Sequence, residues 1–306
     1  MNSPKLASIL ILSALTLAGC AGNTSNSNAS ATRSNIYDRE NSDRLSAKLS
    51  FVAIPVRHGD RNWNLGAVLR IPYGHSEKVP AVIVVHGSGG VDSRGGHYVQ
   101  MLNQAGIATL EIDLWAARGV RSPAERPRSV VETLPDAFAA LDFLAKNENI
   151  RPDKIGIMGF SWGGVVSMLT ADKKYQEQFA VSPNQSFAAH APFYPVCWVY
   201  NVAPGYEFGN LTSAPVLIQA GLADTYDEPE TCSKLVDALA PHDKAHVRLI
   251  MYENATHAWE RREPDAVAGD PYSHLGKGGD VPLRYNATAT EASTNAVIEF
   301  FNNNLR

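Results

Sequence analysis

The chain has 306 residues, of which 44% are hydrophobic, and a formal net charge of −4. The length allows one large domain or two small ones, and the hydrophobic content suffices for a buried core. The charge gives no electrostatic reason to expect a nucleic-acid partner, and no basic run with interleaved aromatic residues is present. The composition therefore predicts a globular protein and argues against nucleic-acid binding.

The first 19 residues have the pattern of an export signal. Lys5 precedes an apolar run over 6–17, which is shorter than a membrane span of about 20 residues and fits the core of a signal peptide. The run ends in Leu17-Ala18-Gly19-Cys20, which resembles a bacterial lipobox, where the cysteine is acylated and becomes the mature N-terminus. We expect a signal peptide over 1–19 and a lipid anchor on Cys20. The alternative is an ordinary secretory signal with an incidental cysteine.

The segment after Cys20 has the composition of a tether. Residues 21–35 are rich in Asn, Ser, Ala and Thr, and they carry too little apolar surface to fold. We expect a flexible tether over 20–44 and a single folded domain over 45–306. Ala21 stands where an aspartate would retain a Gram-negative lipoprotein in the inner membrane, so by this resemblance the outer membrane is favoured. The expected location is the bacterial cell envelope, facing the periplasm.

Two further cysteines, Cys197 and Cys232, belong to the predicted domain. Export to an oxidising compartment favours a disulfide between them. Both lie close in sequence to segments that we place at one end of the predicted sheet. The alternative is two separate buried thiols.

The hydrophobic pattern predicts an α/β fold. Residues 49–56 and 65–71 are β-rich runs separated by a polar turn, and they predict an antiparallel hairpin. The continuous apolar run 81–85 predicts a strand covered on both faces. Further strands are expected over 107–112, 155–158, 187–194, 215–219 and 247–252, and helices over 98–104, 130–145, 165–170, 229–239 and 291–303. This alternation predicts one domain with a mostly parallel sheet and helices on both faces.

The pattern G-x-S-x-G spans 159–163, between a predicted strand and a predicted helix. A serine on such a turn has a strained backbone, with its oxygen pushed out of the sheet. Side chains two residues before and after Ser161 would clash, and Gly159 and Gly163 remove that clash. The amide of Trp162 then points to where an oxyanion would form. The alternative is a glycine-rich turn that contains a serine by chance.

A second glycine-rich loop follows the strand over 81–85. It reads His86-Gly87-Ser88-Gly89-Gly90, and such a loop lets backbone amides approach a ligand. We expect Ser88 to donate the second oxyanion hydrogen bond, with Gly89 as the nearest competitor. His86 is interpreted as a brace of the loop rather than as a catalytic base.

Ser161, Asp224 and His257 occur in the order nucleophile, acid, base, and each falls where a predicted strand ends. Aligned parallel strands bring these ends to one edge of the sheet. The serine needs a histidine to take its proton, and the histidine needs a carboxylate to fix its tautomer. Asp227 and Glu228 are rivals for the acid. His242, His246 and His274 are rivals for the base.

On these residues the chain resembles the dienelactone hydrolase family of the α/β-hydrolases over about residues 79–257 and the last helix. The matching motifs are His86-Gly87, Asp113-Leu114-Trp115, the elbow over 159–163, Phe193-Tyr194-Pro195, Gly221-Leu222-Ala223-Asp224 and Ala255-Thr256-His257-Ala258-Trp259. The resemblance implies an α/β-hydrolase fold and hydrolysis of small carboxylic esters or lactones through an acyl-enzyme. The best-known members have cysteine in the elbow, so Ser161 points toward a broader esterase than dienelactone itself.

The same members hold a substrate carboxylate with arginines, which suggests an anionic substrate here. Arg261 falls where one of these arginines would lie, and Arg118 lies near the second, one position out of register. Alternatively, Arg261 pairs with Glu260, Glu263 or Asp265. The segment 260–286 departs from compact family members, and we expect it to form a lid or rim.

Two other functions remain open at this level. Gly163-Gly164 also fits a peptidase resembling the prolyl oligopeptidases, although only a hairpin precedes the core. A lipid-anchored envelope protein with a degenerate hydrolase fold is the alternative from outside the enzyme class. The sequence has no metal-ligand spacing, and its glycine loop lacks the lysine of a nucleotide-binding loop, so we expect neither a metal nor another cofactor.

Overall fold

Residues 47–183 and 185–306 are described in the structure, which is a computed structural model. The expected signal peptide over 1–19, the lipid anchor on Cys20, the tether over 20–44 and the domain start at residue 45 lie outside these residues. Within the described part of the chain, no helix combines the length and apolar character needed to cross a membrane.

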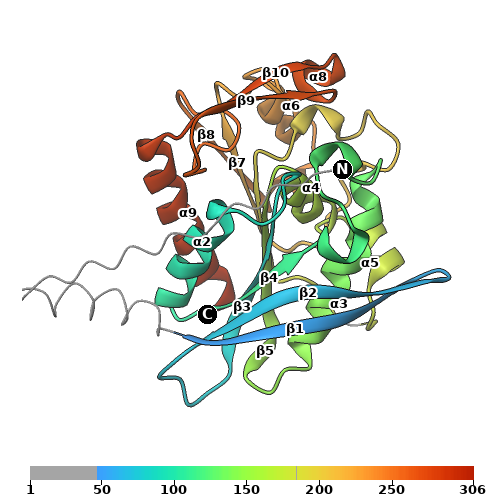
Figure 1. The fold of residues 1–306 in the computed structure, drawn as a ribbon, viewed down its shortest axis with the longest axis vertical. Coiled ribbons are helices and arrows are strands. Elements are labelled where there is room, and N and C mark those ends of the chain that lie inside the picture. Colours follow the sequence, from blue (N-terminus) through green and yellow to red (C-terminus); the bar gives the residue numbers. More distant parts are fainter. Residues whose placement is uncertain (1–46, 184) are drawn as a thin grey trace, which may run out of the picture. The chain divides into compact units, whose positions relative to one another are not determined.

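An eight-stranded sheet forms the centre of the domain, with the strand order β1-β2-β4-β3-β5-β6-β7-β8 (Figure 1). The hairpin β1–β2 is antiparallel and pairs antiparallel with β4, whereas the remaining neighbours are parallel. The predicted fold class, a mostly parallel sheet with an N-terminal antiparallel hairpin, is confirmed. The strands are β1 (Ala47–His58), β2 (Arg61–Pro72), β3 (Val79–Val85), β4 (Ala108–Asp113), β5 (Ile150–Phe160), β6 (Ala189–Phe193), β7 (Val216–Gly221) and β8 (Val247–Tyr252).

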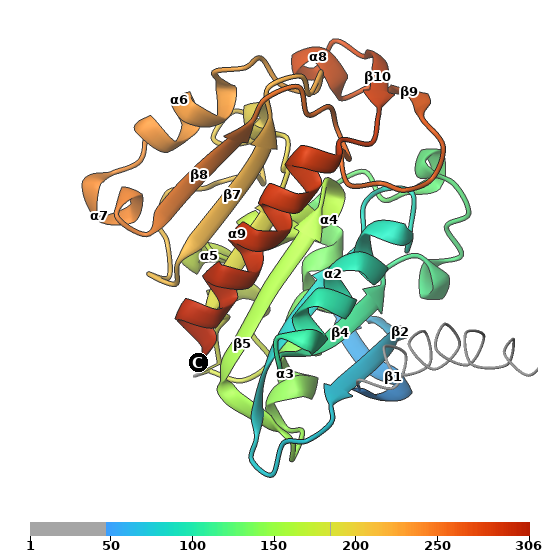
Figure 2. The same cartoon turned by 90° about the vertical axis from the view of Figure 1, so that its left-hand side faces the viewer.

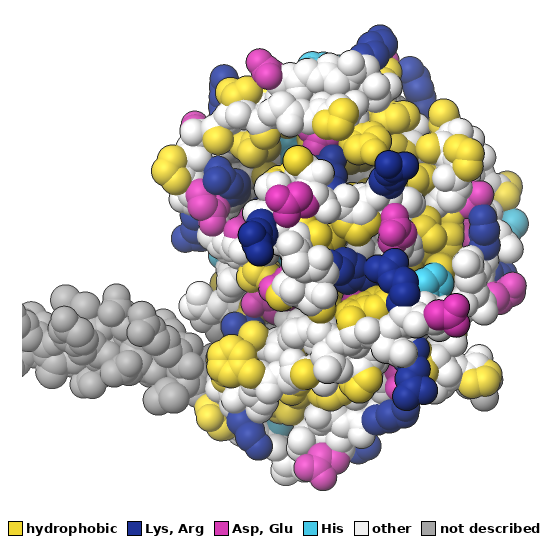
Figure 3. Space-filling model, turned by 45° about the vertical axis from the view of Figure 1, so that its right-hand side comes forward, with side chains coloured by type: hydrophobic (Ala, Val, Ile, Leu, Met, Phe, Trp, Pro, Cys, Tyr) yellow, Lys and Arg dark blue, Asp and Glu magenta, His cyan; other side chains and the backbone are white. Residues whose placement is uncertain are grey.

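Helices cover both faces of the sheet. Figures 1 and 2 show α2 and α9 on one face and α3, α4 and α5 on the other. The helices are α2 (Ser93–Gln104), α3 (Leu134–Ala145), α4 (Trp162–Leu169), α5 (Lys173–Phe179), α6 (Thr231–Asp237), α7 (Pro241–Lys244), α8 (Ser273–Gly276) and α9 (Ala287–Leu305). On the side shown in Figure 3, basic and acidic side chains are interspersed with hydrophobic ones.

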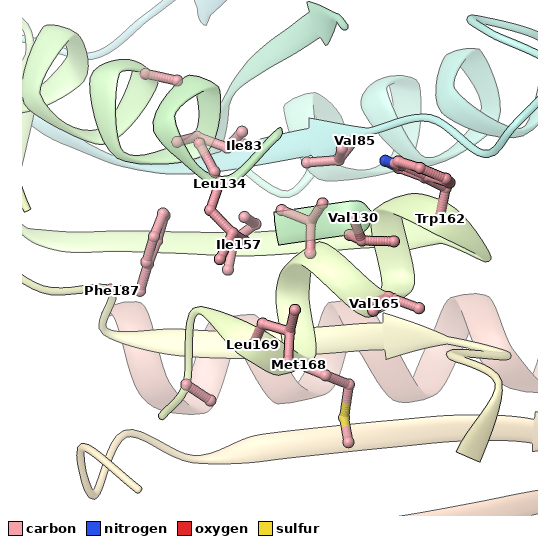
Figure 4. Packing of buried hydrophobic residues seen from close by; sticks show 14 of the residues in the cluster. Ile83, Val85, Val130, Leu134, Ile157, Trp162, Val165, Met168, Leu169 and Phe187 are labelled. Carbon is pink, nitrogen blue, oxygen red and sulfur yellow. The ribbon is translucent and has the colours of Figure 1, made fainter. Parts of the chain in front are cut away.

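The apolar run of β3 is continuous because both of its faces are buried. Val82 and Val84 belong to a hydrophobic cluster on the side of α2 and α9. Ile83 and Val85 point the other way, into a second cluster with residues of α3 and α4 (Figure 4). Successive residues of a strand alternate between faces, so one strand contributes to two hydrophobic layers.

Some elements differ from the sequence-based expectation. Helix α2 begins earlier than expected because Asp92 caps it, its side chain accepting a hydrogen bond from the Arg94 amide. The expected helix over 229–239 is shorter and is followed by a separate helix, α7. Helix α5 was not predicted.

The segment 260–286 contains a small antiparallel pair of strands, β9 (Ala266–Asp270) and β10 (Gly279–Leu283), with α8 between them. The amides of His274 and Leu275 donate hydrogen bonds to the carbonyls of Thr225 and Tyr226. These bonds fasten the segment to the loop that follows β7. Asp270 and Tyr272 from this segment line the pocket that contains Ser161, so it forms a rim at the carboxyl end of the sheet, as expected.

Cys197 and Cys232 form a disulfide, with their Cα atoms 5.1 Å apart. Cys197 begins a short 3-10 helix after β6, and Cys232 lies in α6, after β7. The bond therefore ties together two connections at the same end of the sheet. This is the pairing that the sequence favoured.

Candidate active site

Ser161 lies on the sharp turn between β5 and α4. Its backbone has φ 53° and ψ −107°, a conformation that costs a non-glycine residue about 1–3 kcal/mol and that the surroundings must hold. The Ser161 amide donates to the Phe193 carbonyl at 3.0 Å, and the Gly163 amide donates to the His86 carbonyl at 3.1 Å. The turn is therefore fastened to the ends of the strands on both sides of β5.

The two glycines of the motif permit the close approach that this turn needs. A Cβ atom on Gly159 would collide with the carbonyl of Gly163, and a Cβ atom on Gly163 would collide with the carbonyl of Val85. Both contacts are with backbone, which cannot move aside without disturbing the sheet. The steric reason predicted from the sequence for these two glycines is confirmed.

The loops after β7 and β8 bring Asp224 and His257 together. The amides of Leu222 and Ala223 donate to the carbonyls of Tyr252 and Ala255, at 2.9 and 3.0 Å. His257 Nδ1 lies 2.7 Å from Asp224 Oδ2, and both side chains are buried. We assign the proton of the neutral imidazole to Nδ1, because a carboxylate can only accept, which leaves Nε2 as an acceptor.

Asp224 is held from a second direction as well. Its Oδ1 accepts a hydrogen bond from the Tyr226 amide at 2.9 Å. With both oxygens engaged, the carboxylate cannot rotate away from the imidazole. The Tyr226 ring in turn packs against His257, with 4.3 Å between the ring centroids.

The rivals of Asp224 and His257 have other contacts. Asp227 accepts hydrogen bonds from the amides of Cys197 and Trp198, at 2.7 and 2.8 Å. Burial raises the pKa of Asp227 to about 7, and the charge of Asp224 acts in the same direction. Glu228 is exposed. His242 lies beside Asp243, and the ring of His274 lies beside the Asp280 carbonyl.

Ser161 lines a pocket with about 480 Å³ of empty space, part of it open to solvent. Most of the wall is apolar or aromatic, as is common in small-molecule sites. Within the described residues, Ser161 has no hydrogen bond to His257. The pocket is lined by Ser88, Arg126, Arg128, Val130, Ser161, Trp162, Val165, Val196, Val199, Tyr206, Tyr226, Asp270 and Tyr272.

The two expected oxyanion residues, Ser88 and Trp162, line this pocket together with Ser161. Trp162 is the first residue of α4, where backbone amides lack partners within the helix. Ser88 lies in a tight turn closed by a hydrogen bond from the Gly90 amide to the Gly87 carbonyl, and its own carbonyl accepts from Trp115 Nε1 at 3.0 Å. Both residues therefore border the space beside Ser161, and their role in an oxyanion hole stays a prediction.

His86 braces the glycine loop, as the sequence analysis expected. Its Nε2 accepts a hydrogen bond from the Leu114 amide at 2.9 Å, and its Nδ1 lies 2.7 Å from the Gly87 carbonyl. Burial lowers the pKa of this imidazole. Both ring nitrogens are occupied by backbone groups, so His86 has no free nitrogen for proton transfer.

The structure places Arg118 and Arg261 outside the lining of this pocket, which does not fit the expected contact with substrate. Arg118 binds Asp136, a fully buried residue of α3, with an Nη2–Oδ2 distance of 2.6 Å, and stacks on Trp63. A buried carboxylate requires such a partner. Arg261 donates to the Pro264 carbonyl and lies 3.5 Å from Glu263. For Arg261, this is the alternative given by the sequence, in which it pairs with an acidic residue of the segment 260–286.

Two arginines that the sequence analysis did not single out do line the pocket. Arg126 pairs with Asp270 at 2.9 Å, and its guanidinium lies 5.7 Å from the Trp162 ring and 5.4 Å from the Tyr272 ring. Arg128 is exposed and forms no ion pair with any described residue. Both belong to the irregular loop with four arginines after β4, whose course the hydrophobic pattern does not define.

Comparison with known proteins identifies the family of the chain. The model of the dienelactone hydrolase family matches residues 65–305. The chain belongs to this family. A probable 2-oxo-3-(5-oxofuran-2-ylidene)propanoate lactonase of Bradyrhizobium is 26% identical over 197 residues, which cover 62% of this chain and 77% of that protein.

Solved structures of similar proteins share the α/β-hydrolase fold. A dienelactone hydrolase-like promiscuous phosphotriesterase from metagenomic libraries superimposes with a TM-score of 0.58 at 20% identity, over 84% of this chain and 99% of that one. A dienelactone hydrolase from Anabaena variabilis gives a TM-score of 0.53 at 22% identity, with the same coverage. At these identities the likeness concerns the fold alone.

Replacing either acidic residue of the loop after β7 distinguishes their roles. Asp224→Asn should lower kcat for an activated ester by about 10⁴-fold, because an amide at this position stabilises the wrong imidazole tautomer and not the imidazolium. Asp227→Asn should lower kcat less than about 10-fold, because Asp227 holds backbone amides. Steady-state kinetics of both folded variants provides the measurement. A larger loss in Asp227→Asn than in Asp224→Asn would contradict the assignment.

Proposed function

We propose that this protein is a serine hydrolase that cleaves small carboxylic esters or lactones through Ser161, His257 and Asp224. Family membership makes it a carboxylic-ester hydrolase rather than a non-catalytic envelope protein. The observation that carries the catalytic proposal is the hydrogen bond between Asp224 and His257, at the same sheet edge as the strained turn of Ser161. His86 and Asp113 also lie at this edge, 3.8 Å apart, but both ring nitrogens of His86 contact backbone groups.

In the proposed first step, Ser161 Oγ attacks the substrate carbonyl carbon while His257 Nε2 takes the hydroxyl proton. The Asp224 carboxylate stabilises the imidazolium that results. The carbonyl oxygen gains negative charge, which the amides of Trp162 and Ser88 stabilise by hydrogen bonds. The tetrahedral intermediate then collapses, the bond to the leaving alcohol breaks, and His257 gives its proton to the alcohol oxygen.

The second step repeats this chemistry with water. His257 takes a proton from a water molecule, whose oxygen attacks the acyl carbon on Ser161. The bond to Ser161 breaks, the serine oxygen receives the proton from His257, and the carboxylic acid leaves. A lactone opens to a hydroxy acid by the same sequence. The similarity to a probable lactonase supports lactones as well as open esters.

A peptidase activity is the second candidate from the sequence. An amide needs stronger protonation of its leaving group than an ester does, and the described chain before β3 adds only the hairpin β1–β2. The family and the lactonase relative both favour esters. We therefore propose ester or lactone hydrolysis as the primary activity.

Replacement of the nucleophile tests the proposal. Ser161→Ala should lower turnover of an activated ester by about 10⁴- to 10⁶-fold, as for other triad serines, because the acyl-enzyme cannot form. The assay compares purified wild type and variant, both lacking residues 1–35, at matched concentration. A variant that keeps its thermal unfolding transition and more than a tenth of the activity would contradict the proposal.

We propose further that the substrate is anionic and that Arg128, rather than Arg261 or Arg118, binds its negative group. Arg128 lines the pocket and has no ion-pair partner among the described residues, so its guanidinium is free to bind a carboxylate. The substrate in the name of the Bradyrhizobium relative carries a carboxylate.

Two esters of equal size, one with a carboxylate and one neutral, separate the arginines. Arg128→Gln should lower kcat/KM for the anionic ester by about 10-fold or more, equivalent to roughly 1.4 kcal/mol, and hardly affect the neutral ester. Arg261→Gln serves as the matched control and should change both esters alike. A selective loss in Arg261→Gln, or equal losses in Arg128→Gln, would contradict the role of Arg128.

We also propose that the protein is anchored by a lipid on Cys20 in the bacterial cell envelope, in the outer membrane and facing the periplasm. The lipobox-like sequence supports this, and so does the disulfide, which persists in oxidising compartments. Cys20→Ser should abolish metabolic labelling with palmitate and release the protein from the membrane fraction. Unlabelled full-length wild type in a bacterial host would contradict the anchor.

A further inference from the structure

A chain of buried polar side chains lies beside the imidazole of His257 and is not part of the triad. Tyr194 follows β6, Glu260 comes three residues after His257, and Arg94 lies in the first turn of α2. The Tyr194 hydroxyl donates to Glu260 Oε1 at 2.6 Å, and Arg94 Nη1 donates to the Tyr194 hydroxyl at 3.3 Å. All three residues are buried.

Tyr194 connects this chain to the proposed base. Its ring meets the His257 ring edge-on, with 4.6 Å between centroids, while Tyr226 packs on the same imidazole. The backbone of Tyr194 has φ 36°, which is unfavourable for a residue with a side chain. The Tyr194 amide donates to the Gln219 carbonyl at 2.7 Å. The backbone bond and the hydroxyl bond to Glu260 thus hold the ring from both ends.

Burying the carboxyl group of Glu260 costs free energy of desolvation. The residue is 0% exposed, and its Oε2 is buried without a hydrogen-bond partner among residues 47–183 and 185–306. Burial raises the pKa of Glu260 to about 7, opposed by the charge of Arg94 and the hydrogen bond from Tyr194. A glutamine or an apolar side chain could fill the space without this desolvation cost. A buried carboxylate beside a catalytic base therefore calls for a functional explanation.

The turn that carries Glu260 also carries His257. The Arg261 amide donates to the Ala258 carbonyl, and Ala258 has φ 58°. The Trp259 carbonyl accepts from the Asn286 amide at 2.8 Å, which fixes the turn to the start of α9. Because four consecutive residues form one tight turn, the position of Glu260 and that of His257 are linked through the backbone as well as through Tyr194.

We propose that Glu260 is a positioning residue for His257 and acts through Tyr194. Its carboxylate holds the Tyr194 hydroxyl, so that the tyrosine ring supports the imidazole in the orientation of its hydrogen bond to Asp224. Its negative charge stabilises the positive charge that His257 carries after it takes the serine proton. This inference rests on the proposed triad.

Other charged and titratable groups around Glu260 also influence its pKa. Arg94 is balanced by Asp92, which accepts from its Nε at 2.9 Å. Three tyrosines from different elements also surround Glu260. Burial and the charge of Glu260 raise the pKa of each tyrosine hydroxyl, so all three stay protonated at neutral pH. The groups that face Glu260 are Asp92, Arg94 and Tyr98 near α2, Tyr194 after β6 and Tyr252 at the end of β8.

The sign of the pH effect follows from the charges. An ionised Glu260 stabilises positive charge on the nearby imidazole, and protonation of Glu260 weakens that effect. In the wild type, the acidic limb of the pH profile of kcat/KM then contains two coupled ionisations and is shallower than that of a single group. Removing the carboxylate leaves one ionisation, so the limb becomes steeper and moves to lower pH.

The test is the pH profile of kcat/KM for a neutral activated ester with Glu260→Gln and Tyr194→Phe. Glu260→Gln should lower kcat by about 10-fold at pH 8 with KM changed less than about 2-fold, and should steepen the acidic limb and shift it to lower pH. The thermal unfolding temperature at pH 8 should not fall, because glutamine avoids the burial of a charge. Tyr194→Phe should shift the limb in the same direction, and the double variant should lose little more than either single one.

Tyr252→Phe is the matched control. Its hydroxyl donates a buried hydrogen bond of 2.6 Å to Gln219, and its ring packs on Trp259 in the same aromatic cluster. This variant should keep the wild-type pH profile. Unshifted profiles in both Glu260→Gln and Tyr194→Phe, or an equal shift in Tyr252→Phe, would overturn the role of Glu260. An active Ser161→Ala would instead overturn the triad, so the two failures are distinguishable.

Discussion

The strained turn at Ser161 is the constraint on which the site depends. The hydrogen bonds from the amides of Ser161 and Gly163 to carbonyls at the ends of β6 and β3 hold it. These bonds and the close contacts of the two motif glycines can form because β3, β5 and β6 are neighbours in the sheet. The nucleophile is therefore positioned by the rigid centre of the sheet. The proposed acid and base come from loops after β7 and β8, which are hydrogen-bonded to one another.

The sequence predicted those parts of the molecule that local patterns define. A continuous apolar run such as 81–85 indicates a strand with two buried faces, and β3 has two. The motif around Ser161 predicts that the positions two residues before and after the serine have no room for a side chain. The contacts of Gly159 and Gly163 confirm this. Asp224 and His257 could be assigned because parallel strands end at one edge, so that distant positions in the chain converge there.

The arginines and the rim could not be assigned in the same way. The sequence suggested Arg118 and Arg261 by their places in the chain, but Arg118 pairs with the buried Asp136 and Arg261 lies beside the partly exposed Glu263. Neither acidic residue lines the pocket. The loop that carries Arg128 lacks a hydrophobic period, so its path depends on tertiary contacts. The hydrogen bond between Tyr194 and Glu260 joins residues 66 positions apart, and no spacing in the sequence predicts it.

The most direct test of the account is to trap the acyl-enzyme and locate it. The protein lacking residues 1–35 is mixed with an activated ester, quenched in acid within the first turnover, and digested for peptide mass spectrometry. We predict a single added acyl group on the peptide that contains Ser161, absent from Ser161→Ala. Turnover without an adduct on that peptide, or an adduct on another residue that forms at the catalytic rate, would contradict the account.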